Sequence, residues 1–177
     1  MAYVQLPEGL PGIVGLFERY RETARPMREL AQLLLRSDSG LSPAEREVIA
    51  TYVSSLNACP FCARSHGAAA AHLPGGRWEA VAAVAAGSIE GAAISEKLRA
   101  LLRIARKVTQ SGSAVTSEDV ARAREQGAGD REIHDTVLIA AAFCMYNRYV
   151  DGLATWAPED AAAYEAMGER LAKEGYA

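Results

Sequence analysis

The sequence predicts an all-α protein, and two observations support this. Helix-forming alanine, leucine, glutamate and arginine dominate nearly every segment, and no stretch alternates apolar and polar residues for long. Helix-start signals also recur: residues 42–45 (SPAE) place serine at the N-cap, proline at the first helical position and glutamate where it closes a capping box. A chain of 177 residues is long enough for one ordinary core. We therefore expect a single helical domain over residues 1–177, with two loosely similar halves at about 1–87 and 88–177.

Helical segments follow one another through the first half. Pro26 marks a break or a new first turn in the first of them, because proline inside a helix removes a hydrogen bond. Pro60 starts another helix with Cys59 at or near its N-cap, and Gly87 closes the last one. The expected segments are, in order, residues 12–36 as one or two helices, then 42–57, 60–71 and 78–86.

The second half continues in the same way. Ser95 and either Thr116 or Ser117 are candidate N-caps, and Asp130 caps a long segment that is almost entirely apolar. A helix with so little polar surface lies at the centre of a fold or is buried in a subunit interface. The expected segments are residues 95–109, 116–127, 131–150 and 158–173.

Composition and charge exclude several classes of protein. The chain is 50% hydrophobic and 23% charged, which is typical of a globular protein rather than a disordered one. Its net charge of -3 and the lack of a Lys/Arg cluster argue against a nucleic-acid surface. We see no signal peptide, and the apolar runs are too short to span a bilayer. We therefore expect a cytoplasmic protein, and in that reducing compartment a close cysteine pair is more often catalytic or metal-binding than a structural disulfide.

Two cysteines and a histidine stand close together at the start of one expected helix. Within residues 57–67 (NACPFCARSHG), a helix beginning at Pro60 places Cys59, Cys62 and His66 on one face. The helix N-terminus and a nearby imidazole both favour a thiolate, which is the reactive form of cysteine. The two sulfurs can also close a disulfide, so that one attacks and the other resolves.

Glu47 on the preceding helix is a further candidate. It could face the cysteine helix if the two helices form a hairpin, and a carboxylate there could orient His66 or move a proton through a water. Thiol redox chemistry is the favoured interpretation of this set. Zinc binding stays open, although it needs a fourth ligand, and so does simple packing of two small apolar cysteines and a hydrogen-bonded histidine. The candidates for a fourth zinc ligand are Glu47, His72, His134 and Cys144.

Other chemistry-bearing residues favour structural roles. Cys144 lies in the long apolar segment and is expected in the core. Arg148 and Asp151 stand three apart near the end of that segment and are expected to form an ion pair. Trp78 and Trp156 are expected to pack against other side chains.

The spacing of these residues also resembles a known family. Glu47, eleven intervening residues and then Cys59-x-x-Cys62-x-x-x-His66 resembles the signature of the alkylhydroperoxidase AhpD-like proteins in the carboxymuconolactone decarboxylase superfamily. Residues 41–67 resemble the core of the branch labelled peroxidase-related. Similar stretches are ARP near Ala24, SEKLRALLRIARKVT and VTSEDVARAREQGAGDREIHDTVLIAAAFCMYNRYVDGL, so the resemblance covers most of the chain.

The resemblance implies an AhpD-like helical fold with the CxxC helix hairpin at its core, assembled as a trimer or hexamer. It implies that Cys62 attacks a hydroperoxide, that Cys59 resolves, and that His66 and Glu47 form the proton relay. We expect Cys59, at the helix entrance, to be the more exposed thiol. Phe61 departs from the family pattern, because the best-studied members carry a histidine at that position.

The resulting hypothesis is a dithiol peroxidase or thiol-disulfide oxidoreductase that needs no metal or organic cofactor. Its partners would be a hydroperoxide, a reductant that is either a thiol protein or a low-molecular-weight thiol, and further copies of the chain, with no nucleic acid and no membrane. Two alternatives stay open. One is a decarboxylase-like enzyme that uses His66 and Glu47 as acid and base, and the other is a zinc-binding or redox-sensing interaction module.

Overall fold

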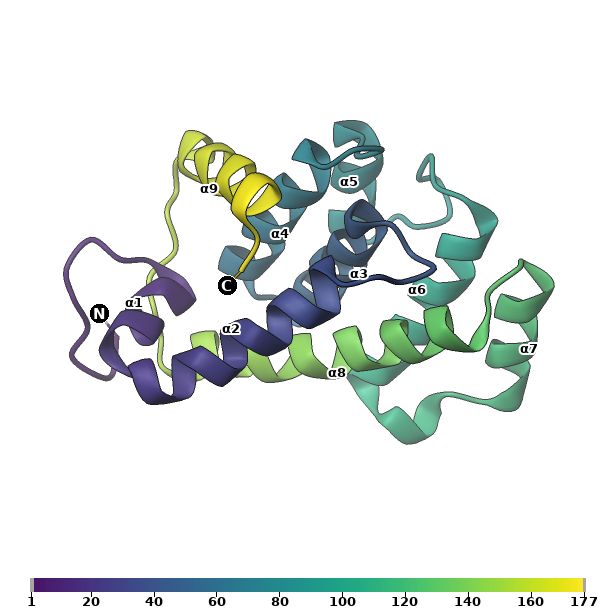
Figure 1. Cartoon of the computed structure of the whole chain (residues 1–177), viewed down its shortest axis with the longest axis horizontal. Coiled ribbons are helices and arrows are strands. Elements are labelled where there is room, and N and C mark those ends of the chain that lie inside the picture. The colour runs from purple at the N-terminus through teal and green to yellow at the C-terminus, as the bar shows by residue number, and fades with distance from the viewer. Residues whose placement is uncertain (1, 177) are drawn as a thin grey trace.

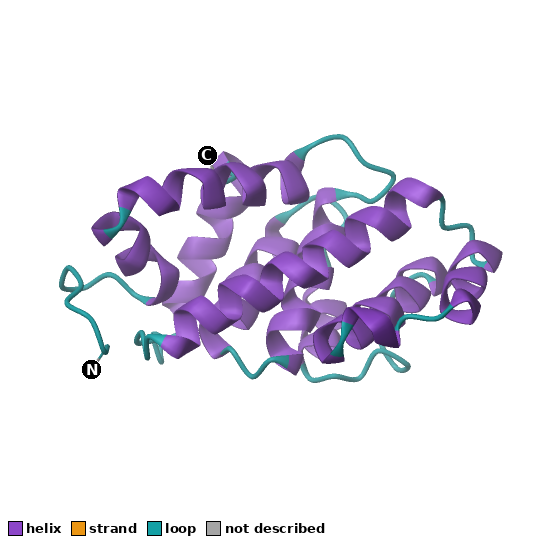
Figure 2. Cartoon of the chain, turned by 90° about the horizontal axis from the view of Figure 1, so that it is seen from below, coloured by secondary structure: helices purple, strands orange, loops and turns teal. Residues whose placement is uncertain are grey.

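The computed structural model describes residues 2–176, and every regular element in that range is a helix (Figure 2). The all-α prediction is therefore confirmed. The elements, in chain order, are α1 (Gly12–Arg19), α2 (Arg21–Arg36), α3 (Pro43–Leu56), α4 (Pro60–His72), α5 (Trp78–Ala85), α6 (Glu96–Gln110), a 3-10 turn (Gly112–Ala114), α7 (Ser117–Glu125), α8 (Asp130–Gly152) and α9 (Ala161–Glu174).

The hairpin of α3 and α4 is the centre of the fold. The capping box expected at the start of α3 is present: the Ser42 side chain accepts from the Glu45 N–H, and the Glu45 carboxylate accepts from the Ser42 N–H. A short turn joins the two helices, with Ala58 at a φ of 55° and the Cys59 N–H donating to the Ser54 carbonyl at 2.9 Å. This turn brings the N-terminus of α4 back beside α3.

A single large core surrounds α3. Most residues of α3 are buried, and α6 and α8 both pack on it. Figure 1 shows α8 running along most of the molecule beside α2. The expectation that the apolar segment before residue 150 is central is confirmed, because its inward face, including Ile139, Ala140 and Phe143, is buried in this core.

Two details of the expected elements were wrong. The first helical region divides at Tyr20, whose ψ of 66° ends α1, and Pro26 lies inside α2. Pro26 is exposed, as is Glu22, whose carbonyl would otherwise accept the missing hydrogen bond, so water can satisfy that group. The N-cap of α8 is Gly129 instead of Asp130, and its N–H is bonded by the Glu132 carboxylate at 2.7 Å.

The C-terminal helix α9 packs closely on α4. Gly168 makes this possible, because a Cβ there would lie 2.4 Å from the Cβ of Ala68. Beyond α9 the chain turns back toward α2 and α4 (Figure 1). Both the cysteine-bearing helix and its surroundings are therefore covered by the C-terminal part of the chain.

No helix of the described residues is long and apolar enough to cross a membrane. The two tryptophans do not pack as expected: Trp78 is 50% exposed and Trp156 is 49% exposed. Trp78 touches the ring of His72 edge-on but stands at the rim of a groove, where its other face meets solvent.

Candidate dithiol site

Both cysteines of the CxxC motif are buried. Cys62 is 3% exposed and Cys59 is fully buried, so the expectation that Cys59 is the more exposed thiol was wrong. Apolar side chains from α1, α8 and α9 cover the N-terminus of α4, among them Val14, Val150 and Tyr164. Both thiols are free.

The two thiols have pKa values shifted in opposite directions. A hydrogen bond from the Cys59 thiol lowers the pKa of Cys62, and the nearby His66 and the Asn147 amide lower it further, which outweighs burial. The same hydrogen bond to Cys62, together with burial, raises the pKa of Cys59 far above its usual value. When one proton leaves this pair, it therefore leaves from Cys62, and Cys59 keeps its own.

His66 and Glu47 are in direct contact. His66 Nδ1 lies 2.7 Å from Glu47 Oε2, across the interface of the hairpin. Because a carboxylate only accepts hydrogen bonds, Nδ1 carries the hydrogen and Nε2 is left to accept a proton. The ring of His66 is also held edge-on by Phe143, with ring centres 4.6 Å apart.

The Glu47 carboxylate is fully buried, and two further residues compensate its charge. Arg36 of α2 pairs with Oε1 at 2.6 Å, and the Tyr176 hydroxyl donates to the same oxygen at 2.5 Å. Burial alone would raise the pKa of Glu47, but the charges and hydrogen bonds of His66, Arg36 and Tyr176 lower it below its ordinary value. Glu47 is thus an ion at neutral pH despite its surroundings.

Arg36 and Tyr176 were missed by sequence reasoning. Arg36 ends a helix like many other arginines, and Tyr176 is 129 residues from Glu47. The only signal in the sequence was indirect: if Glu47 is buried, a cation must lie beside it.

An amide network supports the sulfurs from α8. Asn147 is buried, donates to Ser54 Oγ at 3.0 Å and accepts from Asn57 Nδ2 at 2.9 Å. The same Asn57 group lies 3.4 Å from the sulfur of Cys144. Cys144 was expected inside the core; it is partly buried and packs against the core. This network fixes Asn147 so that its amide favours the Cys62 thiolate.

The expected ion pair between Arg148 and Asp151 does not form. Arg148 donates instead to the carbonyl of Cys144 at 2.9 Å. Burial raises the pKa of Asp151, and the nearby Cys59 thiol opposes this shift. Asp151 therefore belongs to the surroundings of the dithiol and not to a helix-end salt bridge.

Phe61 has a structural position between the two cysteines. Its ring lies on the backbone of Gly12, where an added Cβ would come within 2.3 Å of a ring carbon. Gly12 adopts a φ of 53° and its N–H donates to the Trp156 carbonyl at 2.9 Å. Phe61 therefore docks the N-terminal segment over the dithiol.

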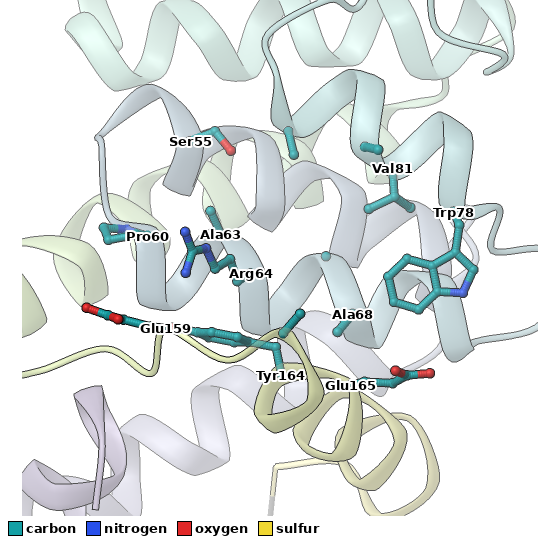
Figure 3. Close-up of a pocket in the computed structure, with 14 residues that line it drawn as sticks. Ser55, Pro60, Ala63, Arg64, Ala68, Trp78, Val81, Glu159, Tyr164 and Glu165 are labelled. Carbon is teal, nitrogen blue, oxygen red and sulfur yellow. The ribbon is translucent and has the colours of Figure 1, made fainter.

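A largely apolar pocket of about 650 Å³ opens beside the dithiol between α4, α5 and α9 (Figure 3). Pro60, Arg64 and Ala68 line it from α4, and Trp78 lies at its rim. Tyr164 lines the pocket and also packs in the cluster around both cysteines. Tyr164 is thus the wall between the pocket and the sulfurs.

Among residues 2–176, no three His, Cys, Asp or Glu side chains are placed to hold a metal ion. Of the candidate fourth zinc ligands, His72 lies against Trp78 and His134 contacts Asp135 at the start of α8.

Comparisons with known proteins agree with this architecture. The model of the carboxymuconolactone decarboxylase family matches residues 21–76, which include Glu47, both cysteines and His66. A search of curated proteins found no significant match.

Solved structures with the same fold include two with 26% sequence identity and a TM-score of 0.79. One is the alkylhydroperoxidase AhpD core of an uncharacterized peroxidase-related protein from Ralstonia eutropha, with 90% of this chain and 81% of that chain covered. The other is an uncharacterized peroxidase-related protein from a Silicibacter species, with 94% and 95% covered. A protein of unknown function from Agrobacterium tumefaciens, proposed to be the antioxidant defence protein AhpD, has 21% identity, a TM-score of 0.71 and coverages of 84% and 99%, and it shows the fold alone.

The fold and the position of the CxxC hairpin define an AhpD-like helical protein. Residues 21–76 are similar to the carboxymuconolactone decarboxylase family, and the segment includes the α3–α4 hairpin.

Proposed function

We propose that this protein is a dithiol peroxidase that reduces hydroperoxides with Cys62 and Cys59. The observation that carries the proposal is the placement of two free thiols at the N-terminus of α4, on the helix whose His66 contacts the buried Glu47. The surroundings lower the pKa of Cys62 and raise that of Cys59, which favours Cys62 as the attacking sulfur. A thiolate is the nucleophile in peroxide reduction, and a neighbouring protonated thiol is placed to condense with the product.

The proposed reaction has three steps. The Cys62 thiol gives its proton to His66, and the thiolate attacks the terminal oxygen of the hydroperoxide. The O–O bond breaks, Cys62 becomes a sulfenic acid, and the alkoxide leaves as an alcohol after taking that proton from His66. The Cys59 sulfur, losing its proton to the relay, then attacks the Cys62 sulfenic acid, forms the disulfide and releases water. A thiol reductant finally returns two electrons and two protons, which restores both thiols.

His66 and Glu47 support this proposal as a proton relay. With Nδ1 donating to Glu47, Nε2 is free to exchange a proton at the sulfur side. Glu47 stabilises the charged imidazolium that forms when His66 takes the proton. A pocket lined mainly by apolar side chains lies on the other side of Tyr164 from the sulfurs, which favours an organic hydroperoxide over a purely polar substrate.

Thiol counting tests the proposal directly. Reduced protein is treated with one equivalent of an alkyl hydroperoxide, and free thiols are titrated before and after. We expect the wild type to lose two thiols and Cys59→Ser to stop at a sulfenic acid. The matched control is Cys144→Ser, which should behave as the wild type. Equal peroxide consumption by wild type and Cys62→Ser would rule the mechanism out.

An acid–base enzyme is the second candidate, because the family match and the Glu47–His66 pair do not depend on sulfur. In that case a Cys59→Ser/Cys62→Ser double variant would still turn over a lactone or keto-acid substrate. Under the dithiol mechanism, the double variant has no activity toward hydroperoxides.

A further inference from the structure

The residue that completes the cluster around Glu47 comes from the tail after α9. Gly175 leaves α9 with a φ of 75°, a conformation that suits glycine, and turns the chain back. The Tyr176 N–H then donates to Gln32 Oε1 of α2 at 2.8 Å. Figure 1 shows this tail descending from α9 beside α2 and α4.

Tyr176 contacts every charged member of the cluster. Its hydroxyl lies 2.5 Å from Glu47 Oε1 and 3.1 Å from His66 Nδ1. Its ring stacks on that of His66 at an angle of 15°, and the guanidinium of Arg36 lies 5.0 Å from the ring centre. Tyr176 thus contacts Glu47 and His66 with its hydroxyl, and His66 and Arg36 with its ring.

We propose that Tyr176 is a positioning residue of the relay, which holds the Glu47 carboxylate in its ionised form and fixes the His66 ring against it. Its catalytic consequence rests on the proposed peroxidase function, whereas its effect on Glu47 does not. The hydroxyl donates to Oε1, so its own lone pair is available to share the Nδ1 hydrogen of His66. The tail thereby holds the Nδ1 side of the His66 ring against Glu47.

The charged groups that face Glu47 are few. Arg36 faces it from α2, His66 from α4 and Tyr176 from the tail, while Arg46 acts on it from its own helix. Burial raises the pKa of Tyr176 well above its usual value, so the phenol stays a neutral donor throughout the range in which Glu47 titrates.

From α8 the neighbour of this cluster is the uncharged ring of Phe143, which contacts His66. No titratable side chain of α8 replaces the Tyr176 hydroxyl. Removing that hydroxyl therefore takes away one of the three donors on the carboxylate and leaves Arg36 and His66.

The test is the titration of Glu47 in the reduced protein with Tyr176→Phe. The protein carries ¹³C-labelled glutamate, and the Glu47 carboxyl resonance is assigned by its loss in Glu47→Gln. We expect the Glu47 midpoint to rise by about one pH unit in Tyr176→Phe, the size of effect of a hydrogen bond to a charged group. Tyr146→Phe is the matched control, since it removes a buried hydroxyl that donates only to the Met27 carbonyl. An unchanged midpoint in Tyr176→Phe would overturn the inference.

Two further measurements keep the outcome clear. If Tyr176→Phe does not fold, Gln32→Leu keeps the tyrosine but removes the acceptor of its backbone N–H. The hydroxyl is then held less firmly at Glu47, and the midpoint should shift in the same direction by a smaller amount. Peroxide consumption is measured separately on each variant. If the Glu47 midpoint shifts but the wild type consumes no peroxide, the peroxidase function is wrong and the role of Tyr176 stands. If the wild type consumes peroxide but the midpoint does not shift, the role of Tyr176 is wrong and the peroxidase function stands.

Discussion

His66 Nδ1 and Glu47 Oε2 lie 2.7 Å apart although the residues are 19 positions apart in the chain. The contact crosses the α3–α4 hairpin and joins a buried carboxylate to the helix that carries both thiols. A buried ion is stable only beside its partners. The stability of the fold and the proposed proton relay therefore depend on the same Glu47–His66 contact.

Replacing Glu47 with glutamine should impair both properties. The neutral amide cannot compensate the charge of the partly buried Arg36, so we expect a loss of about 3 kcal/mol in the free energy of unfolding. Without the carboxylate, the imidazolium loses its stabilising charge, and oxidation of Cys62 by peroxide should slow by about 100-fold. Urea unfolding and stopped-flow thiol loss measure the two effects.

Glu45→Gln is the matched control for that variant. Glu45 lies on the same helix but closes the capping box, a position where glutamine also functions. Wild-type rates and near-wild-type stability are expected. An equal loss in both variants would mean that the helix, and not the Glu47 charge, is responsible.

The stability of the fold should fall on the acid side. The pKa of Glu47 is lower in the folded protein than its ordinary value of 4.5. Its contribution is therefore complete above about pH 4.5 and is lost as the pH falls through the lower folded value. The difference in unfolding free energy between wild type and Glu47→Gln should thus shrink as the pH falls from about 5 to about 3. A difference that stays constant over this range would contradict the assigned shift.

Asn147→Asp should raise the pKa of Cys62. The substitution keeps the shape but replaces a donor that favours the thiolate with a negative charge. The pH midpoint for alkylation of Cys62 by iodoacetamide, followed by mass spectrometry of its peptide, is expected to rise by about one unit. A midpoint at or below that of the wild type would show that Asn147 does not act on the sulfur.

Gly12→Ala should loosen the cover over the dithiol. The added methyl group meets the Phe61 ring, and the φ of 53° at this residue is strained for alanine, so we expect a loss of about 2 kcal/mol and faster alkylation of Cys62. Gly9→Ala is the control, because Gly9 also has a positive φ but nothing lies near its Cβ position. If Cys62 is alkylated at the same rate in both variants, the contact between Phe61 and Gly12 does not limit access to the dithiol.

Local patterns explain what could be predicted from the sequence. The capping box at Ser42 and the proline at position 60 act within a few residues, and they correctly predicted both helices of the hairpin. Once the hairpin is assumed, helical spacing brings Glu47 toward His66. These are short-range effects that composition and spacing record directly.

The remainder depends on packing between distant segments. Cys59 looked accessible because it begins a helix, but segments from α1, α8 and α9 cover it. Tyr176 carries no local signal, since its role follows from the turn at Gly175 and the anchor at Gln32. Tertiary contacts of this kind produce no periodic pattern and no fixed residue spacing in the sequence.

The position of Tyr176 also sets an order of events during synthesis. A growing chain has made Glu47, both cysteines and His66 long before it reaches the segment after α9, and domains are assembled as the chain emerges. Until residue 176 docks, the Glu47 carboxylate lacks the Tyr176 hydroxyl as a donor. The site therefore matures only when this segment has been added, so a nascent product that lacks it should not share the acid–base behaviour of the protein that contains it.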